Sequence, residues 1–296
     1  MSHVIPREHR VSHSEVDYFV QCPRKHYYAY IKNIRRRSSS IALHRGNVGH
    51  ELVEKFFHAL MAGEINVEDR KDYLTNTANQ MFVEGKTDAE SFSILRKQID
   101  AFAFAYPFAD WKILGVEKRL VTKVSDTLYF PFIVDLILRD PDNNIVVVDH
   151  KFTKDFYKPW NLDINPQIPK YIAALREEGK PADIGCYSIF RTGFGQNAGP
   201  ESIYKLQPIE TSEKRIKNTW REQYDVSRMI QDIKVIYRDD PEYVDRTSYR
   251  IANNMVCNSC PFQRICVADL NGWATGPLLK TEYEVKTEEE FVYDES

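Results

Sequence analysis

The spacing of hydrophobic residues divides the chain into a helical first third and a middle part rich in strands. Apolar positions recur at helical spacing over 43–61, 66–84 and 88–106, which predicts three amphipathic helices. From residue 111 the segments WKILGVEKRLVTKV, DTLYFPFIVDLILRD and NNIVVVDHKFT are rich in β-branched and aromatic residues, which predicts three strands. We therefore expect helices first and a sheet after them.

Helices and strands alternate in the rest of the chain. The pattern predicts a helix over 166–178, a buried strand over 182–191, a further strand over 202–209 and a long helix over 212–237. The fold class predicted from these elements is α+β (α/β), a core containing a sheet with helices before and after it.

Two short helices are predicted near the N-terminus. Ser12 and Glu15 have the spacing of a capping box, which marks the start of a helix. Pro23 interrupts the helical pattern, and a second helix is expected to follow it up to residue 30.

The composition is that of an ordinary globular chain of 296 residues, with 43% hydrophobic residues, 28% charged residues and a net charge of −3. No apolar run approaches the roughly 18 residues that a membrane span needs, and the N-terminus lacks the hydrophobic core of a signal peptide. These features predict a cytoplasmic protein with no membrane partner. The five cysteines are then expected to serve metal binding or catalysis rather than disulfide bonds.

Charge is concentrated in two segments. Residues 24–37 interleave basic residues with tyrosines, which predicts either a solvated surface or a weak DNA-binding segment. The candidate DNA contacts are Arg24, Lys25, Arg35, Arg36 and Arg37. The acidic tail over 281–296 is predicted to be disordered.

The second and third predicted strands carry two carboxylates and a lysine. A hairpin turn centred on Asp142, within PDNN, places Asp135 opposite Asp149, and Lys151 shares the face of Asp149. Both strands are apolar, so two buried carboxylates would repel each other and lose solvation. A divalent cation such as Mg²⁺ or Mn²⁺ would neutralise them. The alternative is a half-exposed hairpin in which Lys151 pairs with one of the acids.

These residues resemble the core of the PD-(D/E)XK nucleases, and specifically the RecB-like branch. Asp135 in FIVDL is followed by VVVDHK at 146–151. GNVGHELVE at 46–54 resembles the first motif of that branch, a glycine and then a histidine on a helix, and QIPKY at 167–171 resembles its Q-x3-Y motif. Glu117 falls where the family often has an acidic residue on the preceding strand.

The resemblance implies a restriction-endonuclease-like core, a mixed central β-sheet flanked by helices, with catalysis that depends on Mg²⁺ or Mn²⁺. The metal ligands that it implies are His50, Asp135, Asp149 and the backbone carbonyl of His150. The catalytic residues that it implies are Asp135, Asp149, Lys151, Gln167 and Tyr171.

Three cysteines stand close together in CNSCPFQRIC, as Cys257, Cys260 and Cys266. Four ligands are needed for a tetrahedral zinc or an iron–sulfur cluster, and we choose Cys22 as the fourth because a proline follows it, as one follows Cys260. Cys186 lies in an apolar strand and is interpreted as a buried thiol. An early cysteine with a late C-x2-C-x5-C resembles the iron–sulfur RecB-like nucleases, which include CRISPR-associated, AddB-type and phage-encoded enzymes. A structural [4Fe-4S] cluster is therefore expected, with zinc as its rival.

Four regions follow from these predictions. They are a helical N-terminal region over 1–110 that carries Cys22 and His50, a nuclease core over 111–210, a C-terminal helix with the iron–sulfur segment over 211–280, and the tail over 281–296.

The primary functional hypothesis is a metal-dependent deoxyribonuclease. We expect an exonuclease on single-stranded DNA or duplex ends, in recombination, repair, replication or CRISPR-type processing, with a helicase or recombination and replication proteins as possible partners. It would act in the bacterial cytoplasm, or in the host cytoplasm if phage-encoded. The alternative is a non-catalytic nucleic-acid-binding iron–sulfur module or a partner subunit of a helicase–nuclease. An electron-transfer protein is a third hypothesis, and it leaves the aspartates and lysine unexplained.

Overall fold

The computed structural model describes residues 5–38 and 40–286, and these form two compact units. We call them the sheet unit, Ser40–Arg119 with Ile133–Trp220, and the cysteine unit, the described residues of Met1–Ser39, Leu120–Phe132 and Arg221–Ser296. Each unit is described by itself. Among the described residues, no helix is both long and apolar enough to cross a membrane.

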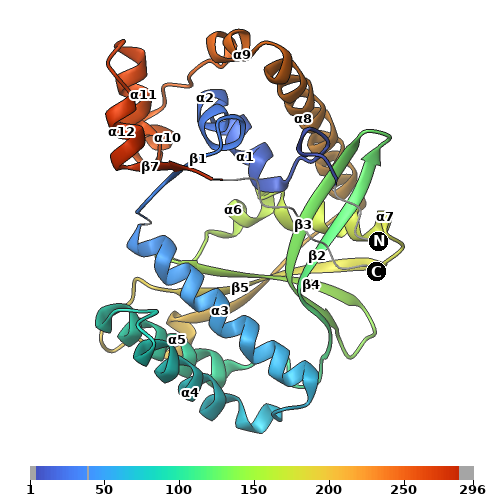
Figure 1. Cartoon of the computed structure of the whole chain (residues 1–296). Coiled ribbons are helices and arrows are strands. Elements are labelled where there is room, and N and C mark those ends of the chain that lie inside the picture. The colour runs from blue at the N-terminus through green and yellow to red at the C-terminus, as the bar shows by residue number, and fades with distance from the viewer. Residues whose placement is uncertain (1–4, 39, 287–296) are drawn as a thin grey trace. The chain divides into compact units, whose positions relative to one another are not determined.

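A five-stranded sheet with the order β2-β3-β4-β5-β6 forms the centre of the fold (Figure 1). β3 and β4 are antiparallel, β4 and β5 are parallel, and β5 and β6 are antiparallel, so the sheet is mixed, as predicted. The strands are β2 Lys112–Ser125, β3 Leu128–Arg139, β4 Ile145–Thr153, β5 Ala182–Arg191 and β6 Tyr204–Ile209. The mixed sheet flanked by helices confirms the predicted fold class.

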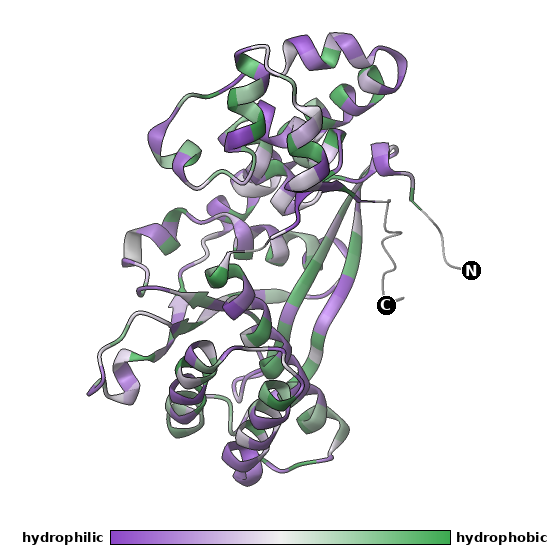
Figure 2. Cartoon of the chain, turned by 60° about the vertical axis from the view of Figure 1, so that its left-hand side comes forward, coloured by the Kyte–Doolittle hydropathy of each residue, from purple (hydrophilic) through white to green (hydrophobic). Residues whose placement is uncertain are grey.

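One face of this sheet packs on helices from the first third of the chain. These helices are α3 Ile41–Ala62 and α5 Ala89–Ala105, and α4 Arg70–Val83, preceded by the short turn η3 Val67–Asp69, packs on both of them. Phe56, Phe57 and Phe102 are almost fully buried there, against Leu136 of β3 and Val148 of β4. Figure 2 shows long hydrophobic stretches along the strands, whereas the helices carry both hydrophobic and hydrophilic residues.

The opposite face packs on α7 Gln167–Glu177, which follows the short α6 Pro159–Ile164. Gly185 of β5 permits this contact, because a Cβ atom at that position would lie 2.2 Å from Cγ2 of Ile168. Val147 pairs with Gly185 in the parallel ladder, and Asp149 pairs with Tyr187 two residues on. Since alternate residues of a strand share a face, Asp149 and Lys151 lie on the side that α7 covers.

The cysteine unit is built from short elements around a small aromatic core. Tyr27, Phe262, Ile265 and Tyr283 are almost fully buried in it. Its first elements are η1 Arg7–His9, α1 His13–Gln21, α2 Pro23–His26, the π-helical turn η2 Tyr27–Ile31 and β1 Ile34–Arg36. Its last elements are the second part of α8 Glu213–Asp239, then α9 Pro241–Thr247, α10 Asn254–Asn258, α11 Gln263–Leu270, α12 Gly276–Thr281 and β7 Tyr283–Val285. The turn η4 Pro200–Ser202 belongs to the sheet unit.

Two predictions near the ends of the chain are corrected. Ser12 caps α1 by accepting a hydrogen bond from the Glu15 amide at 3.2 Å, but the Glu15 carboxylate bonds to His26 and Lys234 instead of completing a capping box. The predicted disordered tail starts inside a small sheet, because β7 pairs antiparallel with β1. The rest of that prediction, 287–296, lies outside the described residues.

Candidate metal centre

The β3–β4 hairpin has the predicted register. Leu136 pairs with Val148 and Arg139 with Ile145, which is the register that a turn centred on Asp142 predicts. The turn closes with Asn143 in the left-handed region, at φ 70°, which asparagine tolerates. The described ladder ends at Leu136, and there the Asp135 Oδ2 atom accepts a hydrogen bond of 2.7 Å from the His150 amide.

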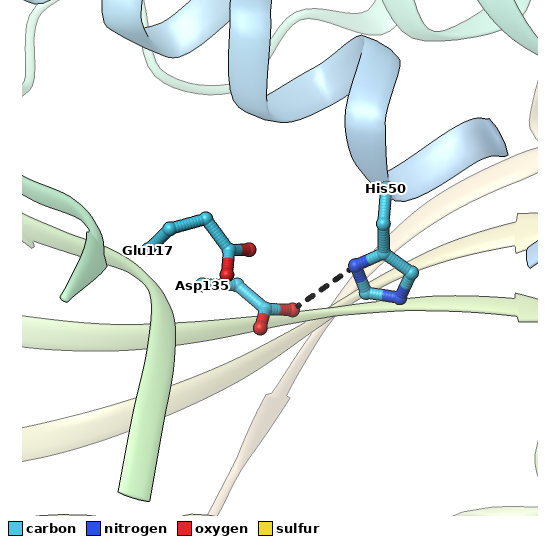
Figure 3. A group of neighbouring side chains, drawn as sticks. All are labelled: His50, Glu117 and Asp135. Atoms are coloured by element: carbon cyan, nitrogen blue, oxygen red, sulfur yellow. Dashed lines mark ion pairs between the residues drawn. The ribbon is translucent and has the colours of Figure 1, made fainter. Parts of the chain in front are cut away.

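His50, Glu117 and Asp135 bring three ligand atoms together, all within 4.8 Å of one another (Figure 3). His50 comes from α3, Glu117 from β2 and Asp135 from β3. His50 Nδ1 lies 3.6 Å from Asp135 Oδ2. Among the described residues, no other group of three or more histidine, cysteine or acidic side chains has its ligand atoms this close together.

Glu117 was absent from the predicted ligand set, although its position on the strand before Asp135 is a signal for it. Its backbone has φ 46°, a left-handed conformation inside a β-strand. Such strained residues concentrate at functional sites, where the surrounding structure holds them. In this backbone conformation, the carboxylate of Glu117 lies beside His50 and Asp135.

Burial and like charge shape the electrostatics of this group. Burial raises the pKa of Asp135 well above its usual range, and the Asp149 and Glu117 carboxylates raise it further. Burial raises the pKa of Glu117 to about 7, with Glu54 and Asp149 adding to the shift. Burial lowers the pKa of His50, which favours the neutral imidazole that binds metals.

Asp149, Lys151 and Gln167 form a second cluster on the α7 side of the sheet. Lys151 Nζ lies 2.6 Å from Asp149 Oδ2 in an ion pair and donates to Gln167 Oε1 at 2.9 Å. Gln167 Nε2 donates to Asp149 Oδ1 at 2.6 Å and to the Tyr171 hydroxyl at 3.2 Å. Although burial lowers the pKa of Lys151, the Asp149 carboxylate outweighs it, so the net shift is upward and the ammonium is retained.

The His150 ring lies on the other face of β4. It stacks on Phe57 of α3 with ring centroids 5.7 Å apart, is only 3% exposed, and neither ring nitrogen has a hydrogen-bond partner among the described residues. Burial lowers the pKa of this imidazole well below its usual value, so it is neutral. The ring therefore has a packing role, as its alternation with Asp149 and Lys151 predicts.

The model of the PD-(D/E)XK nuclease superfamily matches residues 10–267. The chain belongs to this superfamily. Its members are nucleases and usually use Mg²⁺ or Mn²⁺. The carboxylate oxygens and neutral imidazole of the three-residue group are suitable donors for these ions. The raised pKa values of Asp135 and Glu117 fit as well, because a cation would offset the burial and the like charges that raise them.

Two further comparisons add little to this assignment. The crystal structure of SSO0001 aligns over 90% of this PD-(D/E)XK chain and 89% of its own length, with 12% identity and a TM-score of 0.39. A likeness at that score does not bear on the fold or the function. No curated protein matches the sequence.

The four predicted cluster cysteines all belong to the cysteine unit of this nuclease-family chain. Cys22 Sγ accepts a hydrogen bond from the Ile251 amide at 3.4 Å, and Cys257 Sγ donates to the Ile251 carbonyl at 3.8 Å. Burial raises the pKa of Cys260, and the nearby Cys22 and Cys266 thiols raise it further. The cysteines do not form a described group with ligand atoms all within 4.8 Å. Cys186 belongs to the sheet unit, where it is buried in the core.

The basic residues of 24–37 have different surroundings. Arg24 is 5% exposed and is paired with Asp245 and Asp269 inside the cysteine unit. Lys25 donates to Gln21 at 2.8 Å, and Arg35 donates to the Ala29 carbonyl at 3.0 Å. Arg36 and Arg37 are exposed, and Arg37 lies 3.7 Å from Glu284. Their role in DNA binding stays a prediction.

Proposed function

We propose that this member of the PD-(D/E)XK superfamily is a metal-dependent deoxyribonuclease. The observation that carries the proposal is the convergence of His50, Glu117 and Asp135 next to the hairpin that bears Asp149 and Lys151. These groups match those of a phosphodiester hydrolase: acidic metal ligands, a neutral imidazole and the positively charged ammonium of Lys151.

In this proposal His50, Glu117, Asp135 and Asp149 hold one or two Mg²⁺ or Mn²⁺ ions, with the His150 carbonyl as a further ligand. A bound ion supplies charge neutralisation and Lewis-acid activation of the attacking water. The protein contributes donors that its own contacts hold in place, since Asp135 accepts from the His150 amide and Asp149 is bonded to Lys151 and Gln167.

Lys151 has the role of orienting the attacking water and stabilising the negative charge that develops on the phosphate. Its ammonium is held by Asp149 Oδ2 and Gln167 Oε1, at 2.6 and 2.9 Å. Gln167 is in turn bonded to Asp149 and Tyr171, so it fixes the carboxylate and the lysine together. Gln167 and Tyr171 therefore act as positioning residues in the proposal, which also assigns them contacts with the DNA.

More specifically, we propose a RecB-like exonuclease that acts on single-stranded DNA or duplex ends. Its support is the resemblance of the motifs around His50, Asp149 and Gln167 to that branch. We further propose that Cys22, Cys257, Cys260 and Cys266 bind a structural [4Fe-4S] cluster, supported by their spacing and their common unit. The processes proposed are recombination, repair, replication or CRISPR-type processing, together with a helicase or a recombination protein.

Cleavage of end-labelled DNA tests the nuclease proposal. We expect Mg²⁺- or Mn²⁺-dependent degradation of single- or double-stranded substrates, and a loss of about 10³-fold or more in Asp149→Ala and Lys151→Ala. Glu64→Gln, an exposed acid of the same unit, serves as the matched control and should cleave normally. Undiminished cleavage by folded Asp149→Ala would reject the site. A wild-type chain that binds DNA without cutting any substrate would support the non-catalytic binding module instead.

A further inference from the structure

α3 approaches β4 unusually closely at Gly49. A Cβ atom on Gly49 would lie 2.2 Å from Cε1, 2.4 Å from Cζ and 2.6 Å from Cδ1 of the Phe152 ring. All three distances are shorter than any normal carbon contact, so only glycine fits at this position without a displacement. The backbone of the helix thus lies directly against an aromatic ring on the strand.

The Phe152 ring has little room to move away from the helix. Phe190 of β5 stacks on it with ring centroids 4.6 Å apart and an angle of 8° between the planes. His50 lies against it as well, with centroids 5.3 Å apart. The Phe152 ring is held between the Gly49 backbone and the Phe190 ring. The contact between Gly49 and Phe152 therefore acts as a spacer between α3 and β4.

Both partners of this contact are adjacent in sequence to proposed site residues. Gly49 precedes His50, and Phe152 follows Lys151. The contact therefore ties the helix that carries the imidazole to the strand that carries Asp149 and Lys151. His50 Nδ1 is 3.6 Å from Asp135 Oδ2, so a shift of about 1 Å between the helix and the strand would change this distance substantially.

We propose that Gly49 and Phe152 are positioning residues, whose contact sets the distance between α3 and β4 and so places His50 beside Asp135. The expectation that this contact affects metal binding rests on the proposed function. Any side chain at position 49 forces the helix or the ring to move, and His50 moves with the helix.

Gly46 provides a matched control. It lies one turn earlier on the same helix, and a Cβ atom there would meet nothing within 4 Å. Gly46→Ala and Gly49→Ala are the same change with the same effect on intrinsic helix propensity. A difference between them therefore reports the contact with Phe152.

The first measurement needs no metal. The ring-proton NMR signals of His50, assigned with His50→Ala, are recorded for wild type, Gly46→Ala, Gly49→Ala, Phe152→Leu and Gly49→Ala/Phe152→Leu. We expect the His50 signals to shift in Gly49→Ala and to stay native in Gly46→Ala, because only the former disturbs the ring beside the imidazole. The smaller leucine makes room for the methyl group introduced at position 49, so the double variant should match Phe152→Leu.

The second measurement is the Mn²⁺ affinity of the same proteins by calorimetry. We expect Gly49→Ala to bind about tenfold more weakly, the double variant to recover to the level of Phe152→Leu, and Gly46→Ala to be unchanged.

If the His50 signals shift but the affinity does not change, the ligand role of His50 fails and the positioning contact stands. If Gly49→Ala unfolds while the double variant folds, the contact is supported. Native His50 signals in folded Gly49→Ala, or a double variant as impaired as Gly49→Ala, would overturn the proposal.

Discussion

Glu117 combines an unusual backbone with a buried acidic side chain. Its φ of 46° within β2 places it in a region that non-glycine residues rarely adopt. Its carboxylate, with pKa raised to about 7, lies with His50 and Asp135. Backbone strain and a desolvated carboxylate occur together at functional sites, so we infer that Glu117 serves the site rather than stability.

Replacing Glu117 by glutamine should weaken divalent metal binding without unfolding the protein. The amide keeps the size of the side chain but removes one negative charge from the group, so we expect Mn²⁺ affinity to fall about tenfold. Calorimetric titration of the metal-free protein measures this change, with Glu64→Gln as the surface control. An affinity equal to that of wild type would remove Glu117 from the ligand set.

Glu15 is a second buried acid, in the cysteine unit, and it is fully paired. Its carboxylate lies 2.9 Å from Lys234 Nζ and 3.0 Å from His26 Nε2. Although burial raises the pKa of this carboxyl group, Lys234 and His26 lower it by more, so the net shift is downward. A depressed carboxyl pKa contributes stability that is present above the unfolded value and is lost as pH falls through the folded value.

Glu15→Gln should therefore lower the free energy of unfolding by about 3 kcal/mol at pH 7, because it leaves Lys234 buried without its counter-charge. The difference between the variant and wild type should begin to shrink as pH falls below the ordinary carboxyl value of about 4.5, and it should disappear once pH falls through the lower pKa of the folded state. Urea unfolding at several pH values measures it. Glu8→Gln, a partly exposed acid 4.0 Å from Arg238, should change stability by less than about 1 kcal/mol. A pH-independent effect of Glu15→Gln would contradict the role of its charge.

At the scale of elements, Arg24 links three helices of the cysteine unit. From α2 its guanidinium pairs with Asp245 of α9 at 2.6 Å and with Asp269 of α11. Asp269 also accepts from Tyr28 at 2.9 Å and pairs with Arg250. The network joins the segment after Cys22 to the helix that carries Cys266, so it brings the cysteine-bearing segments together without any metal.

Arg24 and Arg36 should therefore respond differently to the same substitution. Arg24→Gln should lower the free energy of unfolding by about 2 kcal/mol, because Asp269 and Asp245 lose a buried partner. Arg36→Gln, on the exposed end of β1, should leave stability unchanged and, if the segment binds DNA, reduce the slope of log affinity against log salt by about 1. Denaturant unfolding and DNA binding at several salt concentrations separate the two effects. Unchanged stability in Arg24→Gln would show that the network is dispensable.

At the scale of the whole molecule, the cysteine unit is assembled from three separate parts of the chain. Cys22 is in the first part, whereas Cys257, Cys260 and Cys266 are in the last. A metal or cluster bound to all four closes a very long loop, and such closure restricts the unfolded chain strongly. The proposed cluster would thus stabilise a unit whose own core is small.

Cys22→Ala should abolish the proposed cluster and lower the melting temperature markedly, because the long loop is no longer closed. Anaerobically purified wild type should show visible absorbance and bound iron, both of which Cys22→Ala should lose. Cys186→Ala, a buried cysteine of the sheet unit, should keep both. A colourless wild-type protein that contains zinc would replace the cluster by a zinc site, and iron retained in Cys22→Ala would remove that cysteine from the ligands.

Local patterns in the sequence were sufficient for most of the fold. The periodicity over 43–61 and the β-branched run before Asp149 predict α3 and β4, because side-chain burial follows directly from the spacing of apolar residues. The PDNN turn likewise fixes the register of the β3–β4 hairpin, in which Leu136 pairs with Val148 next to the two aspartates. The short β1–β7 pair was not predicted, because its three-residue strands carry no periodic signal and pair across almost the whole chain.

The sequence by itself thus determined most helices and strands of the sheet unit and the register of the β3–β4 hairpin. Only the tertiary structure decided that Glu117 joins His50 and Asp135, since these residues come from three elements and meet through packing alone. It also decided that Arg24 is a buried partner of Asp269 and that Gly49 lies against Phe152. Such contacts depend on how closely elements approach one another, a quantity that the order of residues along one element does not contain.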